Sequence, residues 1–137
     1  MSNLEIVQEM YAAFGRGDIP AILSRFSADI EIDVFANHTG QNGEIPWFKP
    51  RRGMADAIDF FNVVGQLKVS EFNVLSLMNG GDQVAAEFTF EADVPGGGHY
   101  RDEEVHLWKF NEQGKVIRLR QYLDSAKHVE AARNWPK

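Results

Sequence analysis

The sequence predicts a single α+β domain in which a curved antiparallel sheet wraps around N-terminal helices and leaves a cavity between the two layers. Two observations support this fold class. Apolar residues with helical spacing dominate the first half of the chain, whereas the second half consists of strand-like segments separated by glycine-rich turns. Helices that precede a run of strands are typical of α+β domains. The length of 137 residues fits one domain over 1–137.

Composition excludes several classes of protein. Hydrophobic residues make up 44% and charged residues 25% of the chain, as in globular domains. There is no cysteine, and His38, His99 and His128 lack metal-ligand spacing, so disulfide scaffolds are excluded and we predict no metal site or other cofactor. A net charge of -6 without a basic face predicts no nucleic-acid partner. No segment has the roughly 20 consecutive apolar residues of a membrane span, and the N-terminus lacks a signal-peptide pattern, so we expect a cytoplasmic protein.

Capping signals place the first two helices. Ser2 and Glu5 have the spacing of a capping box, and the apolar stripe that follows contains Leu4, Val7, Tyr11 and Phe14. The glycines within 15–17 end this helix. Asp18 can cap a second, short helix that tolerates Pro20 in its first turn.

A strand, a loop and a third helix follow. Residues 30–35 alternate as a half-buried strand does, and the polar, glycine and proline residues over 36–50 predict a loop. Trp47 and Phe48 would be wasteful in an exposed loop, so we expect them to fold over the cavity. The third helix follows Gly53.

The remaining segments predict an antiparallel meander. Strands are expected over 67–78, 83–94, 100–110 and 115–123, because each is bounded by a turn rich in glycine or asparagine. The three glycines after Pro95 form one of these turns and no phosphate loop, since no helix follows them. Ser125 can cap a terminal helix that ends near Asn134.

The penultimate strand carries the candidate chemistry. Residues two apart on a strand share a face, so one face contains Asp102, Glu104, His106 and Trp108. Burial and a neighbouring carboxylate both raise the pKa of a carboxyl group, which can then act as a general acid or base near neutral pH. A histidine titrates in this range already and can donate to a developing oxyanion.

The last hairpin allows two registers. A three-residue loop over 112–114 with its glycine left-handed sets Asp102 opposite Asp124 and gathers polar groups on one face. A four-residue loop sets His106 opposite Leu119 and turns every partner on the last strand to the other side. A bulge would reverse the faces once more.

Each candidate residue also has a purely structural interpretation. Asp124 can cap the terminal helix, His106 can be a core histidine, and Glu104 can pair with an arginine on the next strand. Asp102 can be solvated near the strand start, and Asp33 can lie on an exposed edge. The aromatic candidates can belong to the core rather than to a ligand site: Trp47, Phe48, Trp108 and Tyr122.

Several motifs extend over most of the chain. They are MYAAF over 10–14, FSADI over 26–30, RG at 52–53, VHLWKF over 105–110 and RQYLD over 120–124. These motifs resemble the nuclear transport factor 2-like superfamily, specifically its SnoaL-like and ketosteroid-isomerase-like branch. The resemblance implies a cone-shaped α+β fold with a deep apolar cavity, usually in a homodimer packed through the sheet. Members include isomerases, cyclases, hydrolases and modules without catalysis, so the fold does not determine the function.

The resemblance also implies roles for individual residues. Ketosteroid isomerases carry a carboxylate base one position from Asp33, a tyrosine near Met10 with Tyr11 one residue away, and a protonated acid where this chain has His106. SnoaL-like cyclases carry an acid at the end of the last strand, where Asp124 stands. Asp124 is the best single match.

These features predict a small-molecule enzyme that uses acid–base chemistry for isomerisation, cyclisation or hydrolysis. An apolar cyclic carbonyl compound would enter under the loop that holds Trp47. Asp124 or Asp33 would transfer a proton, with Glu104 as a further candidate, while His106 stabilises the enolate oxygen. We expect the substrate to contact Tyr11, Trp47, Phe48, Phe61, Asp102, Trp108 and Tyr122.

Two alternatives stay open at this point. The chain can be a ligand-binding protein without chemistry, or a dimerisation or interaction module of the same fold. We expect a homodimer, because an aliphatic face on the last two strands needs cover if the helices take the other face: Val105, Leu107, Leu119 and Leu123.

Overall fold

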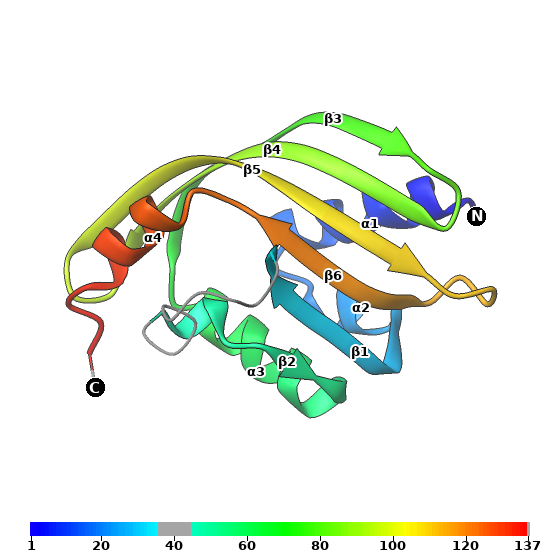
Figure 1. The fold of residues 1–137 in the computed structure, drawn as a ribbon, viewed down its shortest axis with the longest axis horizontal. Coiled ribbons are helices and arrows are strands. Elements are labelled where there is room, and N and C mark those ends of the chain that lie inside the picture. Colours follow the sequence, from blue (N-terminus) through cyan, green and yellow to red (C-terminus); the bar gives the residue numbers. More distant parts are fainter. Residues whose placement is uncertain (36–44, 137) are drawn as a thin grey trace.

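The computed structural model describes residues 1–35 and 45–136, which form one six-stranded sheet with helices against it (Figure 1). The strand order is β2-β1-β6-β5-β4-β3. The elements are α1 (Asn3–Gly15), α2 (Ile19–Leu23), β1 (Phe26–Val34), the 3-10 helix η3 (Pro46–Phe48), β2 (Arg51–Arg52), α3 (Gly53–Val64), β3 (Lys68–Asn79), β4 (Gln83–Val94), β5 (Gly98–Phe110), β6 (Val116–Tyr122) and α4 (Ser125–Ala132). The predicted α+β fold class is confirmed.

The long strands β3, β4 and β5 arch over α1 (Figure 1). Helix α1 buries Ile6, Val7, Met10 and Ala13 in the core. Its predicted capping box is present, because the Ser2 hydroxyl accepts from the Glu5 backbone at 3.1 Å and Glu5 Oε1 accepts from the Ser2 backbone at 3.0 Å. The cavity face of the sheet therefore lies under a helix whose sequence fixes both its start and its buried side.

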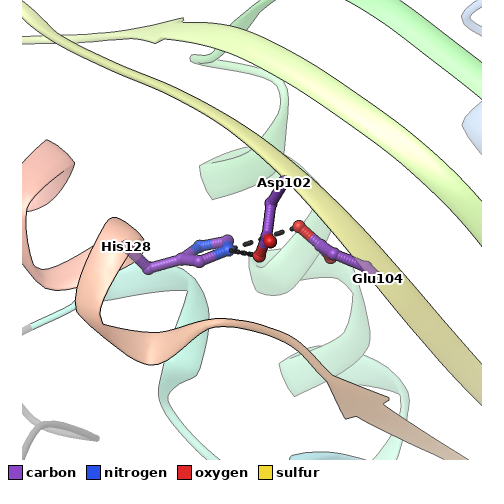
Figure 2. Close-up of side chains that lie close together, drawn as sticks. All are labelled: Asp102, Glu104 and His128. Carbon is purple, nitrogen blue, oxygen red and sulfur yellow. Dashed lines mark hydrogen bonds and ion pairs between the residues drawn. The ribbon is translucent and has the colours of Figure 1, made fainter.

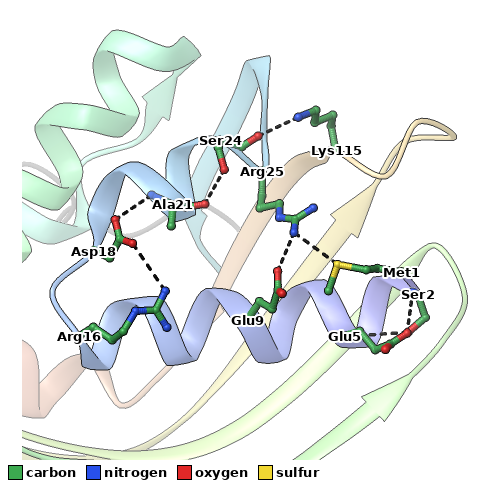
Figure 3. Close-up of polar contacts among 10 residues, drawn as sticks. All are labelled: Met1, Ser2, Glu5, Glu9, Arg16, Asp18, Ala21, Ser24, Arg25 and Lys115. Carbon is green, nitrogen blue, oxygen red and sulfur yellow. Dashed lines mark hydrogen bonds and ion pairs between the residues drawn. The ribbon is translucent and has the colours of Figure 1, made fainter.

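Polar contacts on the outside join α1, α2 and the approach to β6 (Figure 3). Asp18 caps α2 by accepting from the Ala21 backbone at 3.2 Å, as predicted. Arg25, which precedes β1, pairs with Glu9 of α1 at 2.6 Å. Lys115 donates to the Ser24 carbonyl at 2.7 Å. Exposed ion pairs of this kind contribute little free energy, so the apolar core rather than this network holds the layer.

The direction of β1 is a correction to the expected all-antiparallel sheet. β1 runs parallel to β6, with Ile32 opposite Leu119. The two strands are far apart in the sequence, so no hairpin fixes their relative direction. The predicted loop 36–50 lies partly outside the described residues, His38 included. Its last part contains η3 and is followed directly by β2, and the sequence indicated neither element.

The last hairpin combines features of both expected registers. Its loop is the three-residue type, since the Asn111 N–H donates to the Lys115 carbonyl at 2.9 Å and Gly114 has φ 74. Phe110 pairs with Val116, but the preceding residue of β5 pairs with Arg118, so Ile117 is an extra residue in β6.

This bulge reverses the faces of β6. His106 lies opposite Gln121 and Trp108 opposite Leu119, so neither set of partners expected from the sequence is correct. Leu119, Gln121 and Leu123 face the helices. The side chains of Arg118 and Arg120 lie on the opposite, outer face of β6.

Helix α4 packs on the first part of β5 (Figure 1). A Cβ on Gly98 would lie 1.9 Å from the Ala131 carbonyl oxygen, so the strand approaches the helix at a distance that a side chain would prevent. This approach places the side chains of α4 over the cavity face. Among the described residues, no helix has the length and apolar character to cross a membrane.

Candidate functional site

An apolar cavity lies between the concave face of the sheet and the helices, and we call it the inner chamber. Its volume is about 80 Å³, and aromatic and aliphatic side chains from α1, α3 and β3 to β6 form most of its wall. Its polar side chains, tyrosines apart, are Glu104, His106, Gln121 and His128. The predicted grouping of Glu104, His106 and Trp108 on one face of β5 is present here.

A hydrogen-bond chain determines which nitrogen of His106 carries its proton. Trp108 Nε1 donates to the Tyr11 hydroxyl at 2.9 Å, and this hydroxyl lies 2.9 Å from Nδ1 of His106. An indole N–H can only donate, so the tyrosine oxygen accepts from Trp108, and the arrangement that also gives the tyrosine hydrogen a partner has it donate to Nδ1 of His106. The neutral imidazole of His106 therefore carries its hydrogen on Nε2.

The chamber keeps His106 neutral. Burial lowers the pKa of His106 from 6.5 to about 3, and burial also raises the pKa of Tyr11, so both groups hold their protonation state around neutral pH. Among the described residues, Nε2 of His106 has no hydrogen-bond partner. It is thus a neutral N–H donor available to an oxygen atom of a ligand.

A second cluster joins β5 to α4 (Figure 2). Nε2 of His128 lies 3.0 Å from Oδ2 of Asp102 and 3.3 Å from Oε2 of Glu104. All three side chains are buried. The backbone N–H of Asp124 also donates to Asp102, at 3.0 Å.

The two carboxyl groups of this cluster have opposite pKa shifts. Burial acts to raise the pKa of Asp102, but the hydrogen bonds from His128 and from the Asp124 backbone outweigh it and lower the pKa. For Glu104, burial raises the pKa and the nearby Asp102 charge adds to the effect, against the opposing contact with His128. Of the two carboxyl groups, Glu104 therefore has the higher pKa, and it also faces the chamber.

Trp47 determines the tautomer of His128. Its indole N–H donates to Nδ1 of His128 at 2.8 Å, so Nδ1 offers a lone pair and Nε2 carries the hydrogen that points to the carboxylates. The pKa of His128 is lowered by burial and raised by Asp102 and Glu104, with a net rise. Protonation of Nδ1 would nevertheless break the contact with Trp47, which favours the neutral ring.

The same cluster has the spacing of a three-ligand cation site, since the ligand atoms of Asp102, Glu104 and His128 lie within 4.8 Å of one another. Its chemistry fits a proton better than a metal ion. A metal would need the lone pair of Nε2, whereas the Trp47 N–H takes the lone pair of Nδ1 and leaves the hydrogen on Nε2.

The remaining predicted catalytic residues lie outside the chamber. Asp124 is exposed and caps α4 by accepting from the Ala126 backbone at 3.1 Å. Asp33 is buried on the opposite face of β1 from Ile32 and pairs with Arg52 at 2.8 Å. The structure does not bring either carboxylate to His106.

The predicted substrate-contacting residues divide in a similar way. Four of them line the inner chamber: Tyr11, Trp47, Phe61 and Trp108. Phe48 is buried behind them against His128, with ring centroids 5.3 Å apart, and Asp102 lies behind Glu104. Tyr122 faces outward, is 39% exposed and stacks on Phe35.

Sequence reasoning missed His128 as a site residue. It was weighed only as a metal ligand, although it shares the apolar face of the terminal helix with Ala131 and Ala132 at helical spacing. A polar residue on a buried face was the available signal. Sequence reasoning also missed Gln121, because the bulge that turns this residue toward the chamber has no recognisable residue pattern in β6.

Comparison with known proteins agrees with this architecture. Residues 7–119 match the SnoaL-like domain, and the chain belongs to this family. No curated protein matches the chain. An NTF2-like protein of unknown function from Burkholderia pseudomallei has a TM-score of 0.80 at 21% identity, over 96% of this chain and 98% of that one.

Two further similar structures carry more informative names. TerC, crystallised with polyporic acid, has a TM-score of 0.79 at 24% identity, and the alignment covers 96% of this chain and 98% of TerC. A candidate polyketide cyclase from Pseudomonas putida has a TM-score of 0.71 at 25% identity, with the same coverage. The chain thus shares its fold with a protein that was crystallised with a cyclic compound and with one that is named as a candidate polyketide cyclase.

Proposed function

We propose that this protein transfers a proton at a carbon atom next to the carbonyl group of a small cyclic compound. Glu104 is the acid–base group, and the Nε2–H of His106 binds the carbonyl oxygen. The observation that carries this proposal is the pairing of a fixed, neutral N–H donor with a carboxyl of raised pKa, two residues apart on one strand face in an apolar chamber.

The chemistry follows from these two groups. Ionised Glu104 removes a proton from the carbon, and the electron pair moves to the carbonyl oxygen to give an enolate. The enolate oxygen accepts the hydrogen bond from His106, which is strengthened by the mostly apolar wall of the chamber. Where a C=C bond is conjugated with the enolate, Glu104 returns the proton to the far carbon of that bond, which isomerises the compound. Alternatively, the enolate carbon attacks a second carbonyl group to close a ring, and the alkoxide oxygen so formed takes the proton from Glu104.

Asp102 and His128 act through Glu104. His128, held by Asp102, contacts the Glu104 carboxyl at the chamber wall; burial raises the pKa of Glu104, and the negative charge of Asp102 adds to this rise. The exposed cap Asp124 and the arginine-paired Asp33 have no part in this proposal, because both lie outside the chamber. Two similar structures support a cyclic compound as the ligand, since one is named as a candidate polyketide cyclase and TerC was crystallised with polyporic acid.

The test is hydrogen–deuterium exchange of 2-tetralone, followed by NMR in deuterated buffer. This readout needs only enolisation and no knowledge of the natural substrate. We expect the wild type to accelerate exchange and Glu104→Gln and His106→Phe to lose about 100-fold each. Glu103→Gln is the matched control, since Glu103 is the exposed neighbour on the other face of β5. Equal rates for Glu104→Gln and Glu103→Gln would refute the proposed role.

The runner-up function is a binding or dimerisation module without catalysis, and the small volume of the inner chamber favours it. The exchange of 2-tetralone separates the two functions. A pure binding protein would have a higher melting temperature with polyporic acid yet leave this exchange at the rate of buffer. We propose the catalytic function because a chamber built only for binding would not need a buried carboxyl of raised pKa.

A further inference from the structure

The inner chamber is too small for the compound that its chemistry requires. Its volume of about 80 Å³ is roughly half of the ~150 Å³ apolar cavity that holds a benzene ring. Drug-sized ligands occupy pockets of about 300–1,000 Å³. A cyclic carbonyl compound therefore extends beyond the inner chamber when its oxygen reaches His106.

A groove adjoins the chamber on one side. It lies between the C-terminal ends of α1 and α3 and the strand β3, and we call it the outer groove. Its volume is about 720 Å³, which together with the chamber reaches the usual size of a ligand site. Six residues line both spaces: Tyr11, Phe14, Phe61, Val64, Leu67 and Phe72.

Aromatic rings form the partition between the two spaces. The ring of Phe72 lies 5.3 Å from that of Phe14 and 5.5 Å from that of Tyr11, measured between centroids. Phe14 and Phe72 are only half-buried, so a rotamer change of either ring opens the partition. Trp47 also lines the chamber and its ring stacks on that of Tyr100 at 6.0 Å, but most of the loop under which the sequence places the entrance lies outside the described residues.

The side chains that line the outer groove determine which chemical groups bind there. Val69 and Val74 of β3 are 39% and 40% exposed at its edge. Among the described residues, the one charged side chain that lines it is Glu71, which pairs with Arg101 at 3.1 Å. An apolar surface with an acidic and no basic side chain favours an uncharged apolar group and disfavours an anionic one.

We infer that the outer groove is the outer half of the binding site, and that the ligand is an elongated compound whose carbonyl end passes Phe14 and Phe72 while an uncharged apolar substituent lies on Val69 and Val74. The inference rests on the proposed function for the carbonyl end. It adds that the substituent, rather than the reacting ring, supplies most of the affinity.

Binding of cyclohexanone, 4-pentylcyclohexanone and 4-oxocyclohexanecarboxylate, measured by NMR titration, tests this inference. We expect the pentyl group to tighten binding at least tenfold and the carboxylate to weaken it. Val74→Asp should remove most of the gain from the pentyl group and leave cyclohexanone unaffected. Leu75→Asp is the matched control, because Leu75 is the next residue of β3, is 55% exposed and does not line the groove.

Three results would overturn the inference. They are equal affinity for the plain and the pentyl ketone, equal effects of Val74→Asp and Leu75→Asp, or no binding of any ketone at millimolar concentration. Conversion of a dimer to a monomer by Val74→Asp, with unchanged ketone affinity, would assign the groove to a second copy instead. The proposed function can fail separately from this inference. If the pentyl group tightens binding but Glu104→Gln leaves the exchange of 2-tetralone unchanged, the chemistry is refuted and the role of the outer groove in binding stands.

Discussion

The indole nitrogen of Trp47 lies 2.8 Å from Nδ1 of His128, and this contact joins η3 to α4 across the end of the sheet. Through it, a residue before the third helix determines the tautomer of a histidine in the last one. That tautomer in turn points a hydrogen at Asp102 and Glu104, whose pKa values are shifted in opposite directions, with that of Glu104 raised. The protonation state of the chamber is thus set by residues outside the strand that carries the chemistry.

Replacing Trp47 by phenylalanine tests this dependence. The variant keeps an aromatic ring but loses the N–H that disfavours a positive charge on His128, so we expect the pKa of His128 to rise further. The free energy of unfolding should fall by about 1–3 kcal/mol, because Nδ1 is left without a partner. NMR titration of the histidine ring measures the first effect. Trp135→Phe is the control, since Trp135 packs on Trp47 without touching His128, and an unchanged pKa in Trp47→Phe would contradict the argument.

The pH dependence of stability tests the state of Glu104. Its pKa is raised in the folded protein, so its contribution to stability is complete below the unfolded value near 4.5 and is lost as pH rises through the folded pKa. Glu104→Gln lacks this loss. We expect the unfolding free energy of the wild type to fall relative to that of the variant as pH rises above 4.5, where the unfolded carboxyl ionises before the folded one. Urea denaturation at a series of pH values measures this difference in unfolding free energy. The prediction would be refuted if the pH dependence of Glu104→Gln ran parallel to that of the wild type, as we expect for the control Glu103→Gln.

The elements of the fold were predictable because their signals are local. The capping box at Ser2, the cap at Asp18 and the glycine-rich turns each act within a few residues, and all lie where the sequence indicated. The parallel pairing of β1 with β6 depends on contacts between distant segments, for which no local pattern exists.

The candidate site was predictable only in part. The shared face of Glu104, His106 and Trp108 follows from strand alternation and is present. The position of Asp124 depends on one extra residue, Ile117, which reverses every side chain after it. His128 is brought to Glu104 by helix packing, and packing partners cannot be obtained from the spacing of residues along one chain.

The close approach of Gly98 to α4 predicts a strong stability effect. A methyl group at this position would lie 1.9 Å from the Ala131 carbonyl oxygen, so Gly98→Ala should displace α4 and reduce the unfolding free energy by about 1–3 kcal/mol. Gly15→Ala is the control, because a Cβ there has no heavy atom within 4 Å. Denaturant unfolding compares the two variants. Equal stability would show that α4 does not pack tightly on β5.

We propose that the outer face of β5 and β6 pairs two copies of the chain. Leu119 and Leu123 of the expected aliphatic face point into the inner chamber, which leaves Val105 and Leu107 half-buried on the outer face. Sedimentation should show a dimer at micromolar concentration that Leu107→Glu converts to a monomer, because a buried unpaired charge is costly. Leu75→Asp on β3 should leave the dimer intact. A monomeric wild type would refute the pairing.

Substitution of Tyr11 tests most directly which ring nitrogen of His106 carries the hydrogen. Tyr11→Phe removes the hydroxyl between Trp108 Nε1 and His106 Nδ1, so the hydrogen of His106 is no longer fixed on Nε2. In ¹⁵N NMR the wild type should keep the neutral Nε2–H form from pH 8 to 4, because its pKa is about 3, whereas the variant should mix both tautomers. Exchange of 2-tetralone should fall at least tenfold. The control Tyr122→Phe, outside the chamber, should change neither; a wild-type tautomer and rate in Tyr11→Phe would exclude Tyr11 as a positioning residue.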